Sequence, residues 1–197
     1  MLFRYASACA VGAMLFAGPA LAQFGYELDE RQQMLMGGAP KGKAYSLWGI
    51  QAIPKANVSY PGKHTPGTIV IDTAERRLYL VQGDGTAIRY GIGVGREGAS
   101  WAGTSTVSAK REWPDWTPTA EIIKRIPDVP RHMKGGPENP LGARALYLGG
   151  TLYRIHGSNE PETIGQAVSS GCIRLTNEDI IDLYNRVPIG ATVIVQR

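Results

Sequence analysis

From residue 66 onward the sequence is a series of short apolar runs separated by glycine, proline and polar turns, and this pattern limits the possible folds more than any other feature. The runs lie at 68–72, 77–81, 87–94, 105–110, 145–148, 152–155 and 191–195. They are rich in branched and aromatic side chains, as β-strands are, and Gly83-Asp84-Gly85 is a typical hairpin turn. The pattern predicts a mainly β domain, a sandwich or a barrel.

One segment near the C-terminus has the period of a helix instead. Thr176 followed by Asp179 resembles a capping box with Asp in place of Glu. Ile180 and Leu183 then recur at helical spacing, and Pro188 ends the element. We therefore expect one short helix near the C-terminus of the β-domain.

The stretch from residue 113 to residue 142 contains six prolines and no clear period. Loops of this length inside a compact domain are usually functional or disordered. We expect an irregular segment here. Its tryptophans, Trp113 and Trp116, either line a binding site or fill the domain's own core, and His132 is expected to lie at the surface.

The first 22 residues have the pattern of a secretory signal peptide. Arg4 precedes an apolar stretch at 5–16, and Ala20-Leu21-Ala22 gives the small-x-small cleavage pattern. That stretch is shorter than the roughly 20 residues of a membrane-spanning helix, and we expect no membrane span after cleavage. The chain then divides into a signal peptide at 1–22, an N-terminal extension or linker at 23–65 with a short helix near 29–36, and a main domain at 66–197.

The cysteine count changes if the leader is removed. The chain has two cysteines, Cys9 and Cys172, and cleavage leaves only Cys172. An exported protein with one thiol has no intramolecular disulfide. The remaining cysteine is then either a small buried hydrophobe or a reactive group.

Charge and histidine spacing exclude other classes. The chain has 21 Lys and Arg residues and 17 Asp and Glu residues. The resulting formal charge of +4 is too small to predict nucleic-acid binding. The three histidines and the single retained cysteine show no metal-ligand spacing. We expect no metal and no cofactor.

The residues from His156 to Arg174 combine the groups needed for nucleophilic acyl transfer. His156 ends a predicted strand, and Cys172 follows 16 residues later. An imidazole beside a thiol raises the thiolate fraction that attacks a carbonyl. Gly171 leaves room beside the sulfur, and the backbone amides of Gly171 and Cys172 can face an oxyanion. Arg174 adds a positive charge that favours the thiolate or binds a carboxylate.

Each of these residues also has a purely structural interpretation. His156 can be an ordinary histidine at a strand end, Arg174 can pair with Glu178, and Ser169 and Ser170 can be turn residues. The order of His before Cys excludes papain-like enzymes, and the caspase signature is absent. The set taken together, with the sole thiol of an exported chain, favours catalysis.

The sequence resembles the L,D-transpeptidases with the YkuD catalytic domain. The resemblance rests on the run HGSNEP that begins at His156 and the run SSGCIRL that begins at Ser169. It extends over residues 66–195. Many family members have a histidine where this chain has Ser170, and a Pro-Thr-Pro-x-G-rich stretch where this chain has residues 100–106.

The resemblance implies a reaction on the stem peptides of peptidoglycan in the periplasm or cell envelope. Cys172 would attack the bond between the diamino acid and D-Ala, and D-Ala would leave a thioester behind. An amine would resolve it, giving a 3→3 crosslink or attaching an envelope protein. His156 would be the base, the Gly157 carbonyl would orient it, and Arg174 would support the site electrostatically.

The remaining assignments of the resemblance concern the loop before the cysteine. Gly171 would supply an oxyanion amide, Ser169 would shape the loop, and Ser170 would affect substrate preference. The stretch at 113–142 would form a wall or lid over the substrate.

Two other functions stay open at this point. Water can resolve the same thioester, which would make the protein an L,D-carboxypeptidase or a crosslink-cleaving hydrolase. The alternative outside enzymes is a wall-binding module that retains the fold, and the presence of Cys172, His156 and Arg174 argues against it.

Overall fold

The computed structural model describes residues 53–97, 99 and 101–197. Three expectations therefore lie outside the described residues: the signal peptide at 1–22 with its Cys9, most of the extension at 23–65, and the short helix near 29–36. Within the described part, no helix is long and apolar enough to cross a membrane.

A nine-stranded sheet carries the fold, and it confirms the expectation of a mainly β chain. In spatial order its strands are β1 (Ala56–Ser59), β4 (Thr86–Gly91), β3 (Arg77–Val81), β2 (Ile69–Asp72), β11 (Thr192–Gln196), β6 (Gly103–Glu112), β7 (Arg144–Leu148), β8 (Arg154–His156) and β10 (Ile173–Arg174). A separate two-stranded sheet pairs β5 (Val94–Gly95) with β9 (Ala167–Ser169).

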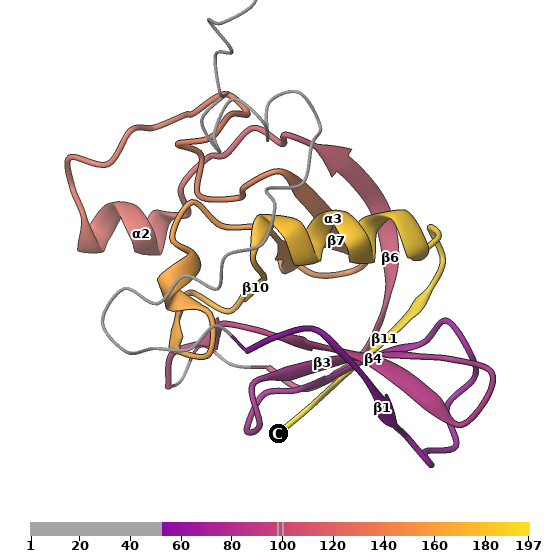
Figure 1. The fold of residues 1–197 in the computed structure, drawn as a ribbon. Helices are drawn as coiled ribbons and strands as arrows, with labels where there is room; N and C mark the ends of the chain where they lie inside the picture. Colours follow the sequence, from indigo (N-terminus) through magenta and orange to yellow (C-terminus); the bar gives the residue numbers. More distant parts are fainter. Residues whose placement is uncertain (1–52, 98, 100) are drawn as a thin grey trace, which may run out of the picture.

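The long strand β6 joins two parts of this sheet. Its first half pairs with β11, and its second half pairs with β7 after a register shift between Val107 and Ala109. An extra residue of this kind bends and twists a strand. Figure 1 shows the result: β1, β3, β4 and β11 form a lower layer, and β6 rises from it towards β7. The core lies between the layers.

Helix α3 (Asn177–Arg186) confirms the short helix expected near the C-terminus. The Thr176 side chain accepts a hydrogen bond from the Asp179 amide at 3.1 Å, as the capping pattern predicts. Ile180 and Leu183 are fully buried in the core, and the helix packs mainly against β7. At its other end, the Lys110 ammonium donates to the carbonyls of Tyr184 and Val187, two acceptors that the helix itself leaves free.

Several elements were not expected from the sequence. Strand β1 lies in the range assigned to the N-terminal extension, yet it pairs antiparallel with β4 in the main sheet. Helix α2 (Ala120–Arg125) lies within the stretch expected to be irregular, and the 3-10 helix η1 (Pro161–Thr163) lies in the loop after His156. Helix α2 buries no side chain, so it leaves no apolar period in the sequence.

The stretch at 113–142 is held in place by backbone hydrogen bonds rather than by a core. Trp116 and Met133 exchange two backbone hydrogen bonds of 2.8 Å. The Asn139 side chain, only 1% exposed, donates to the carbonyls of Pro114, Met133 and Lys134 and accepts from the Leu141 amide. The segment is therefore an ordered loop with its own short helix.

The Asn177 side chain joins two loops at the start of α3. Its oxygen accepts from the Ala143 amide at 2.8 Å, and its nitrogen donates to the Ser158 carbonyl at 3.0 Å. An added Cβ at Gly142 or at Gly157 would lie 2.2 Å from that oxygen. The side chain thus fixes the residues that follow His156 against the residues that precede β7.

We expect Asn177→Ala to lower the free energy of unfolding by about 2–3 kcal/mol, because it leaves a backbone donor and a backbone acceptor without partners in a half-buried site. Urea denaturation measures this. The control is Asn185→Ala on the same helix, where the side chain is exposed and the change should stay within about 0.5 kcal/mol. Equal effects of the two substitutions would contradict the role assigned to Asn177.

Candidate active site

Strand pairing brings the two ends of the segment from His156 to Arg174 together. Strand β10 runs parallel to β8, with Ile173 opposite Ile155 and Arg174 opposite His156. The Leu175 amide donates to the His156 carbonyl at 2.8 Å. Cys172 comes one residue before β10, so the backbone of the thiol residue lies beside the last residues of β8.

Alternation along the two strands separates the core side from the site side. Ile155 and Ile173 are buried in the core, which fixes one face. Side chains alternate between faces along a strand, and in-register residues of parallel neighbours share a face. His156 and Arg174 therefore lie together on the opposite face. Cys172, which directly precedes β10, is half-buried.

The His156 imidazole is fixed by its neighbour. Its Nδ1 lies 2.6 Å from the Gly157 carbonyl oxygen. A carbonyl can only accept a hydrogen bond, so the proton lies on Nδ1 and Nε2 keeps its lone pair. The ring is buried, with 4% of its surface exposed. This arrangement orients a neutral imidazole that can accept a proton.

The surroundings keep His156 neutral. Burial lowers its pKa to about 3, and the positive charges of Arg174 and Arg154 act in the same direction, while the hydrogen bond with Gly157 opposes them. A hydrogen bond with the backbone of Leu141, at the end of the stretch at 113–142, also raises the pKa of this imidazole. One end of that stretch therefore lies beside His156.

The turn before Cys172 is held by Ser169. Its hydroxyl accepts from the Gly171 amide at 3.1 Å and donates to the Cys172 carbonyl at 2.6 Å. The Gly171 amide is thus already engaged. Among the described residues, the Cys172 amide has no protein acceptor. No hydrogen bond of Ser170 occurs within the described part of the chain.

Gly171 is required by its conformation and by close packing. Its φ of +113° lies in a region that residues with a side chain rarely adopt. An added Cβ would lie 2.3 Å from a ring carbon of Tyr153 and 2.8 Å from the Ala99 carbonyl oxygen. Tyr153 in turn stacks on Trp101 at 5.2 Å between ring centroids. The sequence predicts that Gly171 leaves room beside the sulfur, but Tyr153 and the Ala99 carbonyl fill the space that a side chain at Gly171 would take.

Arg174 pairs with Glu160 and not with Glu178. Its guanidinium lies 3.0 Å from the Glu160 carboxylate, which belongs to the loop between β8 and β9. Its backbone exchanges two hydrogen bonds with Gly93 at 2.9 Å. Arg174 thus joins three segments around the site. Four residues contact the site without having been assigned a role from the sequence: Glu160, which stands in the run HGSNEP, and Tyr153, Trp101 and Asn177, which no motif marks.

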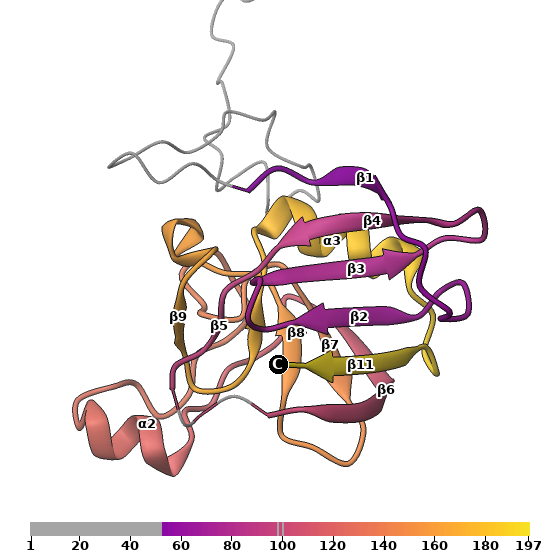
Figure 2. The same cartoon turned by 90° about the horizontal axis from the view of Figure 1, so that it is seen from below.

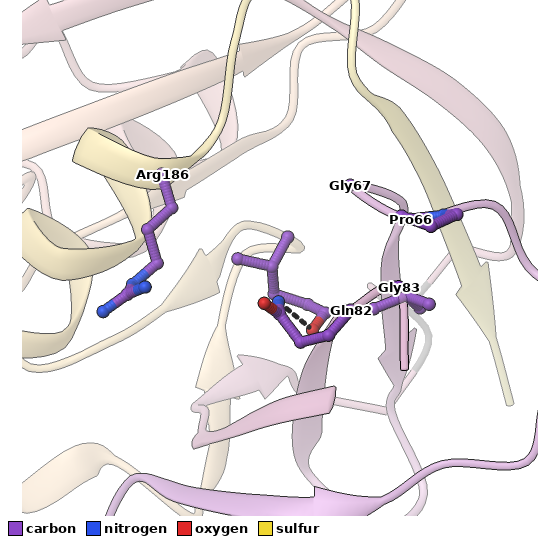
Figure 3. Close-up of a pocket in the computed structure, with 7 residues that line it drawn as sticks. Pro66, Gly67, Gln82, Gly83 and Arg186 are labelled. Atoms are coloured by element: carbon purple, nitrogen blue, oxygen red, sulfur yellow. Dashed lines mark hydrogen bonds between the residues drawn. The ribbon is translucent and has the colours of Figure 1, made fainter. Parts of the chain in front are cut away.

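One cavity in the described chain lies apart from the candidate active site. It has a volume of about 200 Å³ and is lined by Pro66, Gly67, Leu80, Val81, Gln82, Gly83 and Arg186. Figure 3 shows Arg186 of α3 on one side of it and the turn with Gln82 and Gly83 on the other. None of these residues belongs to the candidate active site. No group of three or more His, Cys, Asp or Glu side chains in the described ranges could hold a metal ion, and His132 is exposed beside Asp115.

We expect Gly171→Ala to destabilise the protein more than Gly190→Ala. Both glycines have positive φ, but an added Cβ at Gly190 meets nothing within 4 Å. The difference between the two variants therefore isolates the clash with Tyr153 and Ala99, which we expect to cost about 1–3 kcal/mol. Thermal or urea unfolding of both variants measures it, and equal losses would remove packing as the reason for this glycine.

The buried neutral His156 also predicts a pH dependence of stability. Its pKa of about 3 in the folded state lies below 6.5, the ordinary pKa of a histidine side chain. The unfolded chain therefore binds the extra proton first, and the stabilisation present above pH 6.5 is lost as the pH falls towards 3. Between pH 7 and pH 4 the loss is about 3 kcal/mol.

His156→Gln removes this titration and is the comparison to make. Urea unfolding of both proteins at pH 7 and pH 4 should show the smaller pH dependence in the variant. Carboxylates that titrate in this range contribute equally to both and cancel. A wild-type protein with the same pH dependence as the variant would show that His156 is protonated in the folded state at pH 4.

Known proteins similar to this chain include several L,D-transpeptidases. The model of the YkuD L,D-transpeptidase catalytic domain matches residues 66–195. From Escherichia coli K12, the protein named probable L,D-transpeptidase ErfK/SrfK is 42% identical over 134 residues, covering 64% of this chain and 42% of that protein. The probable L,D-transpeptidase YbiS of the same strain is 43% identical over 134 residues, covering 64% of this chain and 43% of its own. The chain spans less than half the length of these two relatives.

Solved structures support the same fold. L,D-transpeptidase 3 from Mycobacterium tuberculosis superimposes with a TM-score of 0.54 at 20% identity, covering 66% of this chain and 60% of that chain. An L,D-transpeptidase from Mycobacterium smegmatis gives a TM-score of 0.53 at 20% identity, covering 66% of this chain and 58% of that chain. At this identity the likeness concerns the fold alone, and it agrees with the β architecture (Figure 2).

Proposed function

The chain belongs to the YkuD family of L,D-transpeptidase catalytic domains, and from this premise we propose that it transfers peptidoglycan stem peptides through a thioester on Cys172. The thiol attacks the carbonyl of the bond between the diamino acid and the terminal D-Ala, and D-Ala leaves. An amine then attacks the thioester and restores the thiol. The product is a 3→3 crosslink or an envelope protein attached to the stem.

One observation supports the proposal: β10, which directly follows Cys172, pairs with β8, which ends at His156, and the imidazole is held by Gly157. The unprotonated Nε2 takes the thiol proton as the sulfur attacks and gives a proton to the leaving amine. The Gly157 carbonyl keeps the ring in the required tautomer, a role that a carboxylate has in other triads.

The oxyanion of the tetrahedral intermediate needs backbone donors. Among the described residues the Cys172 amide has no acceptor, so it is the donor available to the oxyanion. The Gly171 amide joins it only if it leaves the Ser169 hydroxyl, so we assign Gly171 and Ser169 to the shape of the turn. Ser170 stands next to this turn as a substrate contact, and Arg174 supports the site with its charge.

The same proposal includes the place of the reaction and the layout of the chain. Peptidoglycan lies outside the cytoplasmic membrane, and the leader pattern at 1–22 is what export to the periplasm or cell envelope requires. Residues 66–197 form the catalytic domain, and residues 23–65 form the extension. The pairing of β1 with β4 attaches the end of that extension to the domain.

We expect purified protein incubated with a disaccharide tetrapeptide to release D-Ala and to form a covalent adduct on Cys172, both measured by mass spectrometry. Cys172→Ala should lower the rate of D-Ala release by at least a thousandfold, because the nucleophile is absent. Gly190→Ala serves as the control for handling and folding. Equal rates in Cys172→Ala and wild type would refute the proposal.

The products of that incubation separate the alternatives. Stem dimers indicate transfer to an amine, and tripeptide stems indicate hydrolysis by an L,D-carboxypeptidase. Cleavage of purified 3→3 dimers indicates a crosslink-cleaving hydrolase. Binding of stems without D-Ala release would leave the wall-binding module.

A further inference from the structure

Two guanidinium groups lower the pKa of the His156 imidazole, and in the described part of the chain only one of them has a carboxylate partner. The charges of Arg174 and Arg154 both lower the pKa of His156, so both lie near it. Arg174 is paired with Glu160. In the described part of the chain, Arg154 forms no ion pair.

Strand register places Arg154 on the same face as His156. Arg154 lies two residues before His156 on β8, and side chains alternate between faces along a strand. On the neighbouring strand β10, Ile173 is opposite Ile155, and Cys172 directly precedes Ile173. The backbone of Arg154 therefore lies near the turn that carries Cys172.

The Arg154 guanidinium is held in place, but not all of its N–H donors have a hydrogen-bond partner. It lies 5.1 Å from the centre of the Tyr147 ring on the neighbouring strand β7, and its NH1 makes a long hydrogen bond of 3.4 Å to the Leu152 carbonyl. Its Nε is buried without a hydrogen-bond partner. A buried donor without an acceptor costs free energy that a bound ligand can recover. A planar fork of N–H donors fits a carboxylate best.

We propose that Arg154 binds a carboxylate of the donor stem peptide and so selects the stems that react at Cys172. This inference rests on the proposed function, because it assumes that a stem occupies the site. The two residues that flank the scissile bond each carry a free carboxylate: the C-terminal carboxylate of D-Ala and the second carboxylate at the end of the diamino acid side chain. Arg174 differs from Arg154 because it already has a carboxylate partner in Glu160.

The test measures binding without catalysis. In a Cys172→Ala background, calorimetry gives the Kd of the free tetrapeptide stem, of the stem with a C-terminal carboxamide and of the stem with the diamino acid carboxylate amidated. Each is measured with Arg154 and with Arg154→Gln. We expect Arg154→Gln to raise the Kd of the free stem at least tenfold.

The amides identify which carboxylate is bound. Amidation of the bound carboxylate should itself raise the Kd above that of the free stem, and Arg154→Gln should raise the Kd of that amide no further. This is the coupling expected of a direct contact. Arg154→Lys should recover part of the affinity. Arg89→Gln is the matched control, since Arg89 is also half-buried with an unpartnered Nε but lies on β4. Circular dichroism verifies that each variant is folded.

The outcomes are distinct for the inference and for the proposed function. A loss on Arg154→Gln that is equal for the free stem and for both amides overturns the inference, as does an unchanged Kd or the absence of binding. If the coupling is found and the wild-type enzyme still releases no D-Ala, the inference holds and the proposed reaction fails. A merely structural arginine would lower the affinity for all three stems equally.

Discussion

The parallel pairing of β10 with β8 is the interaction on which the site depends. Two features follow from it: Ile173 enters the core beside Ile155, and Arg174 lies beside His156, with Cys172 in the turn directly before them. A parallel pair needs a crossover, and here the crossover is the loop from Gly157 to Gly171. A shift by one residue would turn every side chain to the other face. The buried isoleucines prevent that shift, so the core specifies the geometry of the site.

The proposed catalytic pair could be predicted from the sequence, but its structural support could not. His156, Cys172 and Arg174 stand in one short motif whose chemistry can be argued from residue types alone. The contacts that hold them come from distant segments: Asn177 bonds to Ala143, and Tyr153 packs on Gly171. Such pairs depend on topology, and no local period reveals them.

The fold shows the same division. Strands with alternating branched residues and the capped helix α3 were predicted, because their local pattern and their burial agree. Strand β1 and helix α2 were missed for opposite reasons. Alternate residues of β1 are exposed at the edge of the sheet, and α2 buries no side chain. Without a buried face, neither element leaves an apolar period in the sequence.

The charges around His156 connect the proposed reaction with the inference about Arg154. An imidazole with a pKa of about 3 is a weak base before substrate binds, and once protonated it is a strong acid towards the leaving amine. A carboxylate bound at Arg154 would cancel one of the two nearby positive charges. The pKa of His156 would then rise at the moment a proton has to be taken from Cys172, while burial, the largest cause of its low value, stays in place. His156 would thus become a stronger base only when a stem occupies the site. Arg154 makes this coupling possible because, in the described part of the chain, its guanidinium has no ion-pair partner.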